Sequence, residues 1–287
     1  MEKISAFTEV ENLKSNKVLV NSDKSCCDSN TTITFQGENN ILVVEDGVRL
    51  HSSKINFNAN NSIIYLSSNK HIYYLNVSVF NDSAVYFGKD NYFNGALNIS
   101  VSEYQNVIIG ADCLFSFGIW IRTADPHVLY DAQTKERINK SKGVFLGDHV
   151  WIGQNVYLLK GTCVGSGAVV GAASVVSGKK LASNCCYGGN PAKLLKENVF
   201  FSHNCVNGWL PNDTKKSQIM DSDDFIYGKS GEIFDFAVVD AKLKKIKTAA
   251  EKKEYLEKVS ASIKSKNRFY IEKPPVKKKS FFSRLFG

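Results

Sequence analysis

The sequence lacks the features of a membrane-spanning or exported protein. None of its apolar runs approaches the ~20 residues that a membrane helix needs. Residues 1–5 lack the apolar stretch of a signal peptide. No Cys-x-x-Cys spacing occurs among the seven cysteines, so neither a zinc site nor a redox motif is indicated. We therefore expect a reduced cytoplasmic protein without a bound metal.

The main body of the chain also lacks an excess of charge of one sign. The net charge is +8, but from Asp240 onward there are fifteen Lys and Arg against five Asp and Glu. The preceding residues hold twenty-one basic and twenty-three acidic side chains, so the body is close to neutral. Because a nucleic-acid-binding domain carries its positive charge on the folded surface, we expect no nucleic-acid partner.

An aliphatic residue recurs at every sixth position in the middle of the chain. These positions are Leu146, Ile152, Leu158, Val164, Val170 and Val176. A second set, two positions earlier, is also small or apolar: Val144, Val150, Val156, Thr162, Ala168 and Ser174. A period of six fits neither a helix nor a flat strand. It predicts a three-sided solenoid in which each flat side points one residue inward and stacked coils bury a continuous column.

The same phase reappears upstream at Ile109, Phe115 and Ile121. Between these positions and Leu146 the phase breaks, and the polar stretch 123–142 reads as an inserted loop. The chain is long enough for one large domain with appendages or for two small domains. We divide it into an N-terminal segment (1–30), a β-helix domain (31–196) containing the inserted loop, a loop-rich extension (197–239) and a basic helical tail (240–287).

Three stretches resemble the hexapeptide-repeat acyltransferases: Gly147–Gly153, Gly165–Val176 and Gly189–Lys193. The resemblance is to the branch that contains galactoside, maltose and xenobiotic acetyltransferases and the O-acetyltransferases of bacterial capsules. It implies a left-handed parallel β-helix, which is an all-β solenoid, and a homotrimer with its active sites between subunits. It also implies acetyl-CoA as the co-substrate. Independently of the resemblance, a closed ring is a reasonable way for a solenoid to bury its flat outer faces.

Acetyl transfer to a hydroxyl needs a base, and histidine is suited to that role near neutral pH. Among the five histidines, His127 opens the inserted loop, and similar enzymes carry their catalytic histidine in such a loop at the same distance before Trp151. A loop histidine can equally be a solvated surface residue. His149 lies within a coil and is a weaker candidate. Asp125 could orient His127 or simply form the turn before Pro126.

Trp151 is offset by one from inward-facing Ile152, so it should project from the coil and either pack at an interface or wall the thioester. The expected coenzyme contacts combine backbone donors, small side chains and cations. They are Trp151, Gly153, Gln154, Ala172, Ala173, Lys179, Lys180 and Lys193. Among them, we expect the backbone N–H groups of Gly153 and Gln154 to meet the thioester carbonyl. Each lysine alone could be a solvated corner residue, and Ser177-Gly178-Lys179 departs from the Thr-Lys-Asp of similar enzymes.

Asn94 and Asn98 lie in the coil before the loop, where similar enzymes hold the sugar acceptor, although asparagine is also common at solenoid turns. The C-terminal part has a helical apolar stripe over 241–266. Residues 273–287 then mix cations with aromatic residues, which suits either an anionic membrane surface or a solvated tail.

These residues, with what the resemblance implies, predict an acetyl-CoA-dependent O-acetyltransferase acting on a bacterial surface glycan. The expected acceptor is a capsular polysaccharide, with sialic-acid-containing capsules included by resemblance, and His127 is the expected general base. One alternative is an acetyltransferase for a free sugar, serine or an antibiotic. Another is a non-catalytic solenoid that serves as a scaffold or glycan-binding module. The size of the C-terminal extension favours a macromolecular acceptor.

Overall fold

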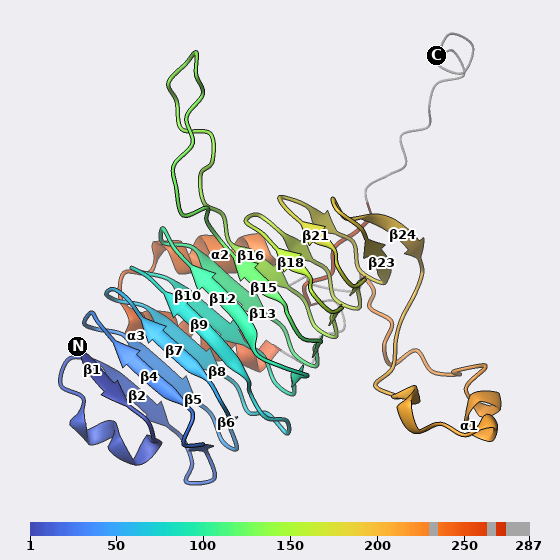
Figure 1. Ribbon diagram of the computed structural model, residues 1–287, viewed down its shortest axis with the longest axis horizontal. Coiled ribbons are helices and arrows are strands. Elements are labelled where there is room, and N and C mark those ends of the chain that lie inside the picture. Colours follow the sequence, from blue (N-terminus) through green and yellow to red (C-terminus); the bar gives the residue numbers. More distant parts are fainter. Residues whose placement is uncertain (230–234, 263–267, 274–287) are drawn as a thin grey trace.

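The computed structural model describes residues 1–229, 235–262 and 268–273. Within them the chain winds as a three-sided parallel β-helix, with the C-terminal residues folded against one side (Figure 1). Residues 274–287, for which we considered a membrane-surface role, lie outside the described residues. No helix in the described ranges has the length and apolar character needed to cross a membrane.

The strands of successive coils stack on three sides, which we call faces A, B and C in the order in which the chain visits them. Face A consists of β1 (Glu2–Ile4), β4 (Thr32–Phe35), β7 (Lys54–Phe57), β9 (Leu75–Val79), β12 (Leu97–Val101), β15 (Trp120–Arg122), β18 (Tyr157–Leu158) and β21 (Val175–Val176). Face B consists of β2 (Lys17–Val20), β5 (Ile41–Val44), β8 (Ile63–Leu66), β10 (Ala84–Phe87), β13 (Asn106–Ile109), β16 (Val144–Leu146), β19 (Cys163–Val164) and β22 (Lys180–Leu181).

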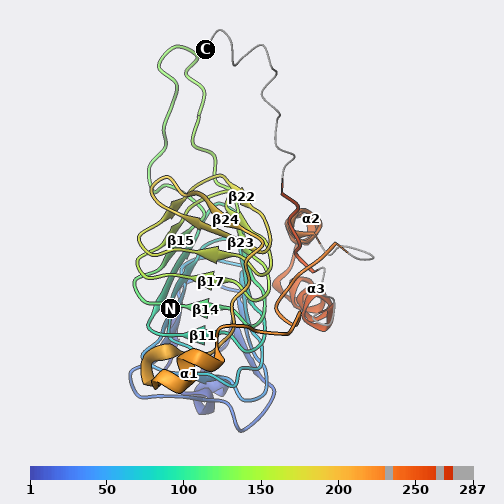
Figure 2. The ribbon, with the colours of Figure 1, turned by 90° about the vertical axis from the view of Figure 1, so that its right-hand side faces the viewer.

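Face C begins with the pair β3 (Cys26–Cys27) and β6 (Arg49–Leu50). The next coil has only an isolated bridge on this face, between Leu50 and Tyr73. A six-stranded sheet follows, part of which is stacked in Figure 2: β11 (Tyr92–Phe93), β14 (Leu114–Phe115), β17 (Trp151–Ile152), β20 (Val169–Val170), β23 (Cys185–Gly188) and β24 (Lys193–Glu197). Antiparallel β24 ends this sheet. At the other end, β2 and β3 already pair in parallel with β5 and β6, so part of segment 1–30 belongs to the stack.

The interior is the apolar column that the sixfold period predicts. Every residue of the main repeat, from Leu146 to Val176, is fully buried, and so are those of the second set, two positions earlier. The upstream members Ile109, Phe115 and Ile121 join the same core. The inward positions are therefore confirmed. Burial of this column, at about 25 cal/mol per Å² of apolar surface, is the main stabilising contribution in such a fold.

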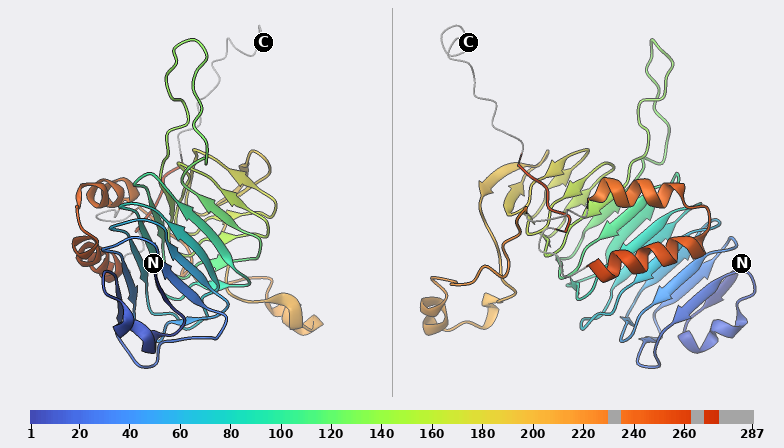
Figure 3. Two further views of the ribbon diagram at one scale, coloured as in Figure 1. Left: turned by 60° about the vertical axis from the view of Figure 1, so that its left-hand side comes forward. Right: turned by 180° about the vertical axis from the view of Figure 1, so that it is seen from behind.

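Two C-terminal helices cover the outer side of face B. Helices α2 (Phe236–Lys245) and α3 (Ala249–Ala261) lie side by side across its strands (Figure 3). Phe236, Leu243 and Leu256 pack there against apolar side chains such as Tyr86 and Ile108. Of the three faces, B is thus occupied by the chain itself.

The inserted loop leaves the solenoid at the edge between faces A and B, after β15 and before β16. It stands away from the stack (Figure 1). The extension that follows β24 contains two short helical segments, η2 (Val206–Gly208) and α1 (Pro211–Lys216). Near the N-terminus, η1 (Phe7–Asn12) packs against the first coils.

Lys252 of α3 provides a test of how this helix docks. Its side chain is almost fully buried and its Nζ donates to the Asp82 carbonyl at 2.5 Å. Burial lowers the pKa of Lys252 to about 8. Because the unfolded chain keeps the ordinary value, the charged lysine destabilises the fold below pH 8, and this cost disappears as the pH rises toward 10.5.

We therefore expect Lys252→Met to raise the free energy of unfolding at pH 7 by about 1–2 kcal/mol, after allowance for the lost hydrogen bond. Urea titrations at pH 7 and pH 9.5 should show the difference shrinking at the higher pH. Lys258→Met, on the exposed side of the same helix, is the control and should change little. A variant that is less stable than the wild type at both pH values would contradict this account.

Candidate functional site

Trp151 projects outward from face C. Strand β17 places Ile152 in the core and Trp151 on the outside, where the indole is 43% exposed. On one side the ring meets Phe201 of the extension, with ring centroids 5.7 Å apart. The sequence-based placement of Trp151 is confirmed, whereas its role stays a prediction.

His127 lies on the inserted loop and is exposed. The loop arises at the edge between faces A and B, and in a three-sided coil this edge is opposite face C. His127 and Trp151 of one chain therefore lie on opposite sides of the prism. Figure 1 shows that the loop points away from the coils instead of folding around them.

Asn139 organises the backbone around His127. Although the loop is exposed, the Asn139 side chain is buried, donates to the His127 carbonyl at 2.8 Å and accepts from the Leu129 N–H at 2.9 Å. It also donates to Asp125, whose carboxylate pairs with Lys160. Asp125 thus fixes the base of the loop, and in the described part of the chain it makes no hydrogen bond to the His127 ring.

A second anchor holds the returning arm of the loop. Arg137 donates two hydrogen bonds to the Glu103 carboxylate, at 2.6 and 2.7 Å, and Ser141 donates a third. These bonds, with that from Arg137 the largest cause, lower the pKa of Glu103 to about 2. Because this pKa is depressed, the anchor is complete above about pH 4.5 and weakens as the pH falls toward 2.

The backbone N–H groups of Gly153 and Gln154, beside Trp151, differ in whether they are available to a ligand. The Gly153 N–H, which we expected to meet the thioester, donates instead to the Val170 carbonyl at 2.8 Å. This expectation is corrected, because the coil ladder already uses the donor. A Cβ on Gly153 would come within 2.6 Å of the Ala172 nitrogen, so this glycine is required for close stacking of the coils. The Gln154 N–H has no acceptor within the described ranges, and Gln154 is exposed.

Ala172 and Ala173 are exposed next to Gln154, on the following coil. The Ala173 N–H donates to the Gln154 carbonyl at 2.8 Å, which joins the two turns. Both alanines are small enough for the pantetheine arm of CoA to lie against the backbone along the edge between faces C and A. Their contact with a coenzyme stays a prediction.

The three candidate lysines start from different sides of the solenoid. Lys193 begins β24 at the end of face C and is exposed. Lys180 lies on face B, and Lys179 precedes it at the edge between faces A and B, where its Nζ donates to the Ala192 carbonyl at 2.6 Å. Because Ala192 directly precedes Lys193, the Lys179 side chain reaches toward Lys193. Lys180 lies on a different face from Trp151.

The two candidate acceptor residues are also separated. Asn94 follows β11 on face C, is exposed, and shares that face with Trp151. Asn98 lies on face A, where its Oδ1 accepts from Asn76 and its Nδ2 donates to the Ile119 carbonyl. Only Asn94 is brought to the face that carries the tryptophan.

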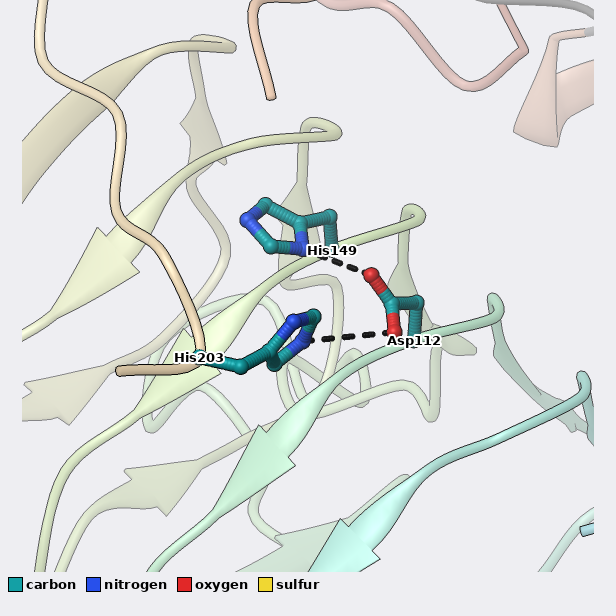
Figure 4. Close-up of side chains that lie close together, drawn as sticks. All are labelled: Asp112, His149 and His203. Atoms are coloured by element: carbon teal, nitrogen blue, oxygen red, sulfur yellow. Dashed lines mark hydrogen bonds and ion pairs between the residues drawn. The ribbon is translucent and has the colours of Figure 1, made fainter. Parts of the chain in front are cut away.

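His149 is fully buried at the edge between faces B and C (Figure 4). Its Nδ1 lies 2.8 Å from the Asp112 carboxylate, and its Nε2 lies 2.9 Å from the Phe201 carbonyl. Its ring stacks between Phe201 and Phe225, with centroids 3.9 and 4.6 Å away. His149 therefore fastens the extension to the coils and is not accessible to an acceptor.

His203 completes this cluster from the extension, with Nε2 3.2 Å from the second Asp112 oxygen. The sequence analysis missed both Asp112 and His203. The sixfold repeat could have indicated Asp112, because Asp112 stands three residues before Phe115, just as His149 stands three residues before Ile152. Residues with equal phase on neighbouring coils lie one above the other. For His203 the sequence carries no comparable signal.

One potential ligand atom from each of Asp112, His149 and His203 lies within 4.8 Å of the other two. Such a set could hold a divalent metal. The same atoms, however, already pair with one another through the contacts described above. Hydrogen bonding and ion pairing thus account for the arrangement.

A buried ion pair makes the second attachment of the C-terminal part. Arg268 is fully buried and binds the Asp148 carboxylate through both Nε, at 2.7 Å, and an Nη. Asp148 also accepts from the Ala111 N–H at 2.7 Å, and Arg268 donates to the Val259 carbonyl at 3.0 Å. Asp148 and His149, which directly precede the coil of Trp151, thus both bind residues from after the solenoid.

Removing one partner of a buried pair leaves an uncompensated charge. We expect Arg268→Met to lower the free energy of unfolding by about 3–5 kcal/mol, and Asp148→Asn in the same chain to restore part of that loss. Urea unfolding measures both. Lys273→Met is the matched control, since Lys273 joins the same segment to Glu197 through an exposed pair, which is worth about 1 kcal/mol or less. Equal losses for the two single variants would contradict the assignment.

Comparisons with known proteins bear on what this arrangement can do. No family model matches the chain. A polysialic acid O-acetyltransferase of Escherichia coli O1:K1 is 39% identical over 90 residues, which are 31% of this chain and 29% of that protein. A polysialic acid O-acetyltransferase of Neisseria meningitidis is 39% identical over 101 residues, which are 35% and 47% of the two chains. These matches thus span less than half the length of the curated relatives.

Two solved structures extend the similarity. The crystal structure of the polySia specific acetyltransferase NeuO is 30% identical, with a TM-score of 0.60, over 70% of this chain and 91% of that chain. The polysialic acid O-acetyltransferase OatWY is 27% identical, with a TM-score of 0.51, over 70% and 93%. The predicted fold class, a left-handed parallel β-helix, is confirmed. The chain belongs to the hexapeptide-repeat, left-handed β-helix acetyltransferases.

Proposed function

We propose that this protein transfers an acetyl group from acetyl-CoA to a hydroxyl of an acidic bacterial surface glycan, with a sialic-acid-containing capsular polysaccharide as the acceptor. The similar proteins named above support the acceptor class. The observation that carries the proposal is an exposed tryptophan beside the Gln154 N–H, which has no acceptor among the described residues. An accessible histidine on the projecting loop adds the candidate base.

In this reaction His127 accepts the proton of the acceptor hydroxyl while the hydroxyl oxygen attacks the thioester carbonyl. The Gln154 N–H donates to the developing oxyanion, and Trp151 walls the acetyl group. When the C–S bond breaks, the protonated His127 returns the proton to the leaving thiolate. Direct attack needs no covalent enzyme intermediate.

The site is assembled between subunits of a homotrimer in this proposal. Within one chain, His127 and Lys180 lie toward the edge between faces A and B, whereas Trp151, Gln154 and Lys193 lie on or beside face C. Since the chain's own helices cover face B, faces A and C are the ones available for association. Contact between face C of one subunit and the loop of the next brings both sets together.

Outward-facing aromatic residues support association through face A as well. Trp120 and Tyr157 stand on neighbouring strands, and Tyr157 is 44% exposed. Arg122 lies over the Trp120 ring, 4.9 Å from its centroid. An apolar patch of this kind on a solenoid face is typical of an interface.

The first test is His127→Ala. Loss of a general base should lower kcat by about 10² to 10⁴-fold, with little effect on the KM for acetyl-CoA. Release of free thiol from acetyl-CoA, with polysialic acid as acceptor, gives the rate. Gln133→Ala, which changes an exposed side chain of the same loop, is the control. Turnover near the wild-type rate in a folded His127→Ala protein would exclude His127 as the base.

A second test asks whether the two halves of the site come from different chains. His127→Ala and Trp151→Ala subunits, each nearly inactive alone, should regain activity when they are refolded together. Random assembly restores about one quarter of the sites if each site takes His127 from one subunit and Trp151 from its neighbour. Mixing the two proteins without subunit exchange is the control. Absence of recovery in verified mixed trimers would show that each chain builds its own site.

A further inference from the structure

Face C is hollowed on the N-terminal side of Trp151. The hollow has a volume of about 420 Å³. Its side walls combine cations, aromatic rings and an amide, contributed by successive coils. The residues that matter here are Arg49, Lys70, His71, Tyr74, Tyr92 and Asn94.

The strand register places this hollow in line with the tryptophan. Tyr92 pairs with Leu114, which pairs with Trp151, so Tyr92 and Trp151 stand in one outward column two coils apart. Neighbouring strands are about 4.8 Å apart, which puts Tyr92 roughly 10 Å from Trp151 and Arg49, two further coils away, roughly 19 Å from it. A chain-like ligand lying along face C would contact both.

The chemistry of the walls suits a chain that bears carboxylates. The nine residues that line the hollow, all of them described, include the cations Arg49 and Lys70 and no acidic residue. One Nη of Arg49 donates to the Lys70 carbonyl at 2.6 Å, which fixes the guanidinium and leaves its other donors available. Arginine binds carboxylates in a bidentate manner.

Aromatic rings provide flat surfaces between these cations. His71 meets the Tyr92 ring edge-on, with centroids 5.2 Å apart, and Tyr92 is 43% exposed. Tyr74 stands on the preceding coil and meets His51 edge-on at 6.1 Å. Asn94, the acceptor residue expected from the sequence, lies in the same wall, which joins the hollow to the acceptor side of the site.

We infer that this hollow is an extended subsite that binds acidic sugar residues of the acceptor chain on one side of the residue being acetylated. The protein then recognises a stretch of polymer, and short acceptors bind less tightly because they do not reach Arg49 and Lys70. This inference rests on the proposed function. It adds that the protein selects its acceptor by chain length and negative charge.

The test reverses the charge of the two outermost cations. Arg49→Glu and Lys70→Glu should each raise the KM for polysialic acid by about tenfold, and the KM for a sialic acid dimer much less. The KM for acetyl-CoA should change less than twofold. Lys17→Glu, an identical charge change on face B, is the matched control. A rise in the KM for acetyl-CoA instead would assign these cations to the coenzyme phosphates and overturn the inference.

Direct binding separates this inference from the proposed function. Fluorescently labelled polysialic acid is titrated with the full-length protein in the absence of acetyl-CoA. It should bind the wild type and the Lys17→Glu control about tenfold more tightly than Arg49→Glu or Lys70→Glu. Equal affinities of all four proteins would overturn the subsite. Absence of acetyl transfer to any glycan would contradict the proposed function. The binding experiment would still decide whether the hollow recognises the acidic chain.

Discussion

The in-register stacking of parallel coils is the constraint on which the rest of the structure depends. Each coil must place an apolar side chain inward at every face, because only then does the next coil bury it. The same register fixes what lies outside. Tyr92, Leu114, Trp151 and Val169 form one straight outward column, so a tryptophan at one coil and a tyrosine two coils earlier face the same ligand.

The C-terminal part of the chain is attached to the solenoid at the edge between faces B and C. Asp148 and His149 occupy a turn between a strand of face B and one of face C, and they bind Arg268 and Phe201, which are distant in sequence. Through these contacts the extension covers face B with two helices and brings Phe201 against Trp151. Asp148 and His149 therefore attach the extension to the solenoid, directly before Trp151, to which we assign a role in acetyl transfer.

The sequence determined the solenoid in unusual detail because its signal is periodic and local. The sixfold recurrence from Leu146 to Val176 gave the inward residues, and the broken phase gave the loop that carries His127. The attachments of the extension could not be derived in this way. Arg268 and Asp148 are far apart in sequence, and nothing in local spacing pairs them. The Gly153 N–H was misassigned because an offset from Trp151 does not reveal that the ladder already uses that donor.

The central claim is that the loop of one subunit meets face C of the next at a bound thioester. A crystal structure of the assembled protein with CoA and a glycan acceptor tests it most directly. The account predicts the sulfur beside Trp151 of one subunit, with the His127 ring of its neighbour within hydrogen-bonding distance, about 3 Å, of the acceptor hydroxyl. A sulfur bound away from face C, or His127 remote from the acceptor, would contradict it.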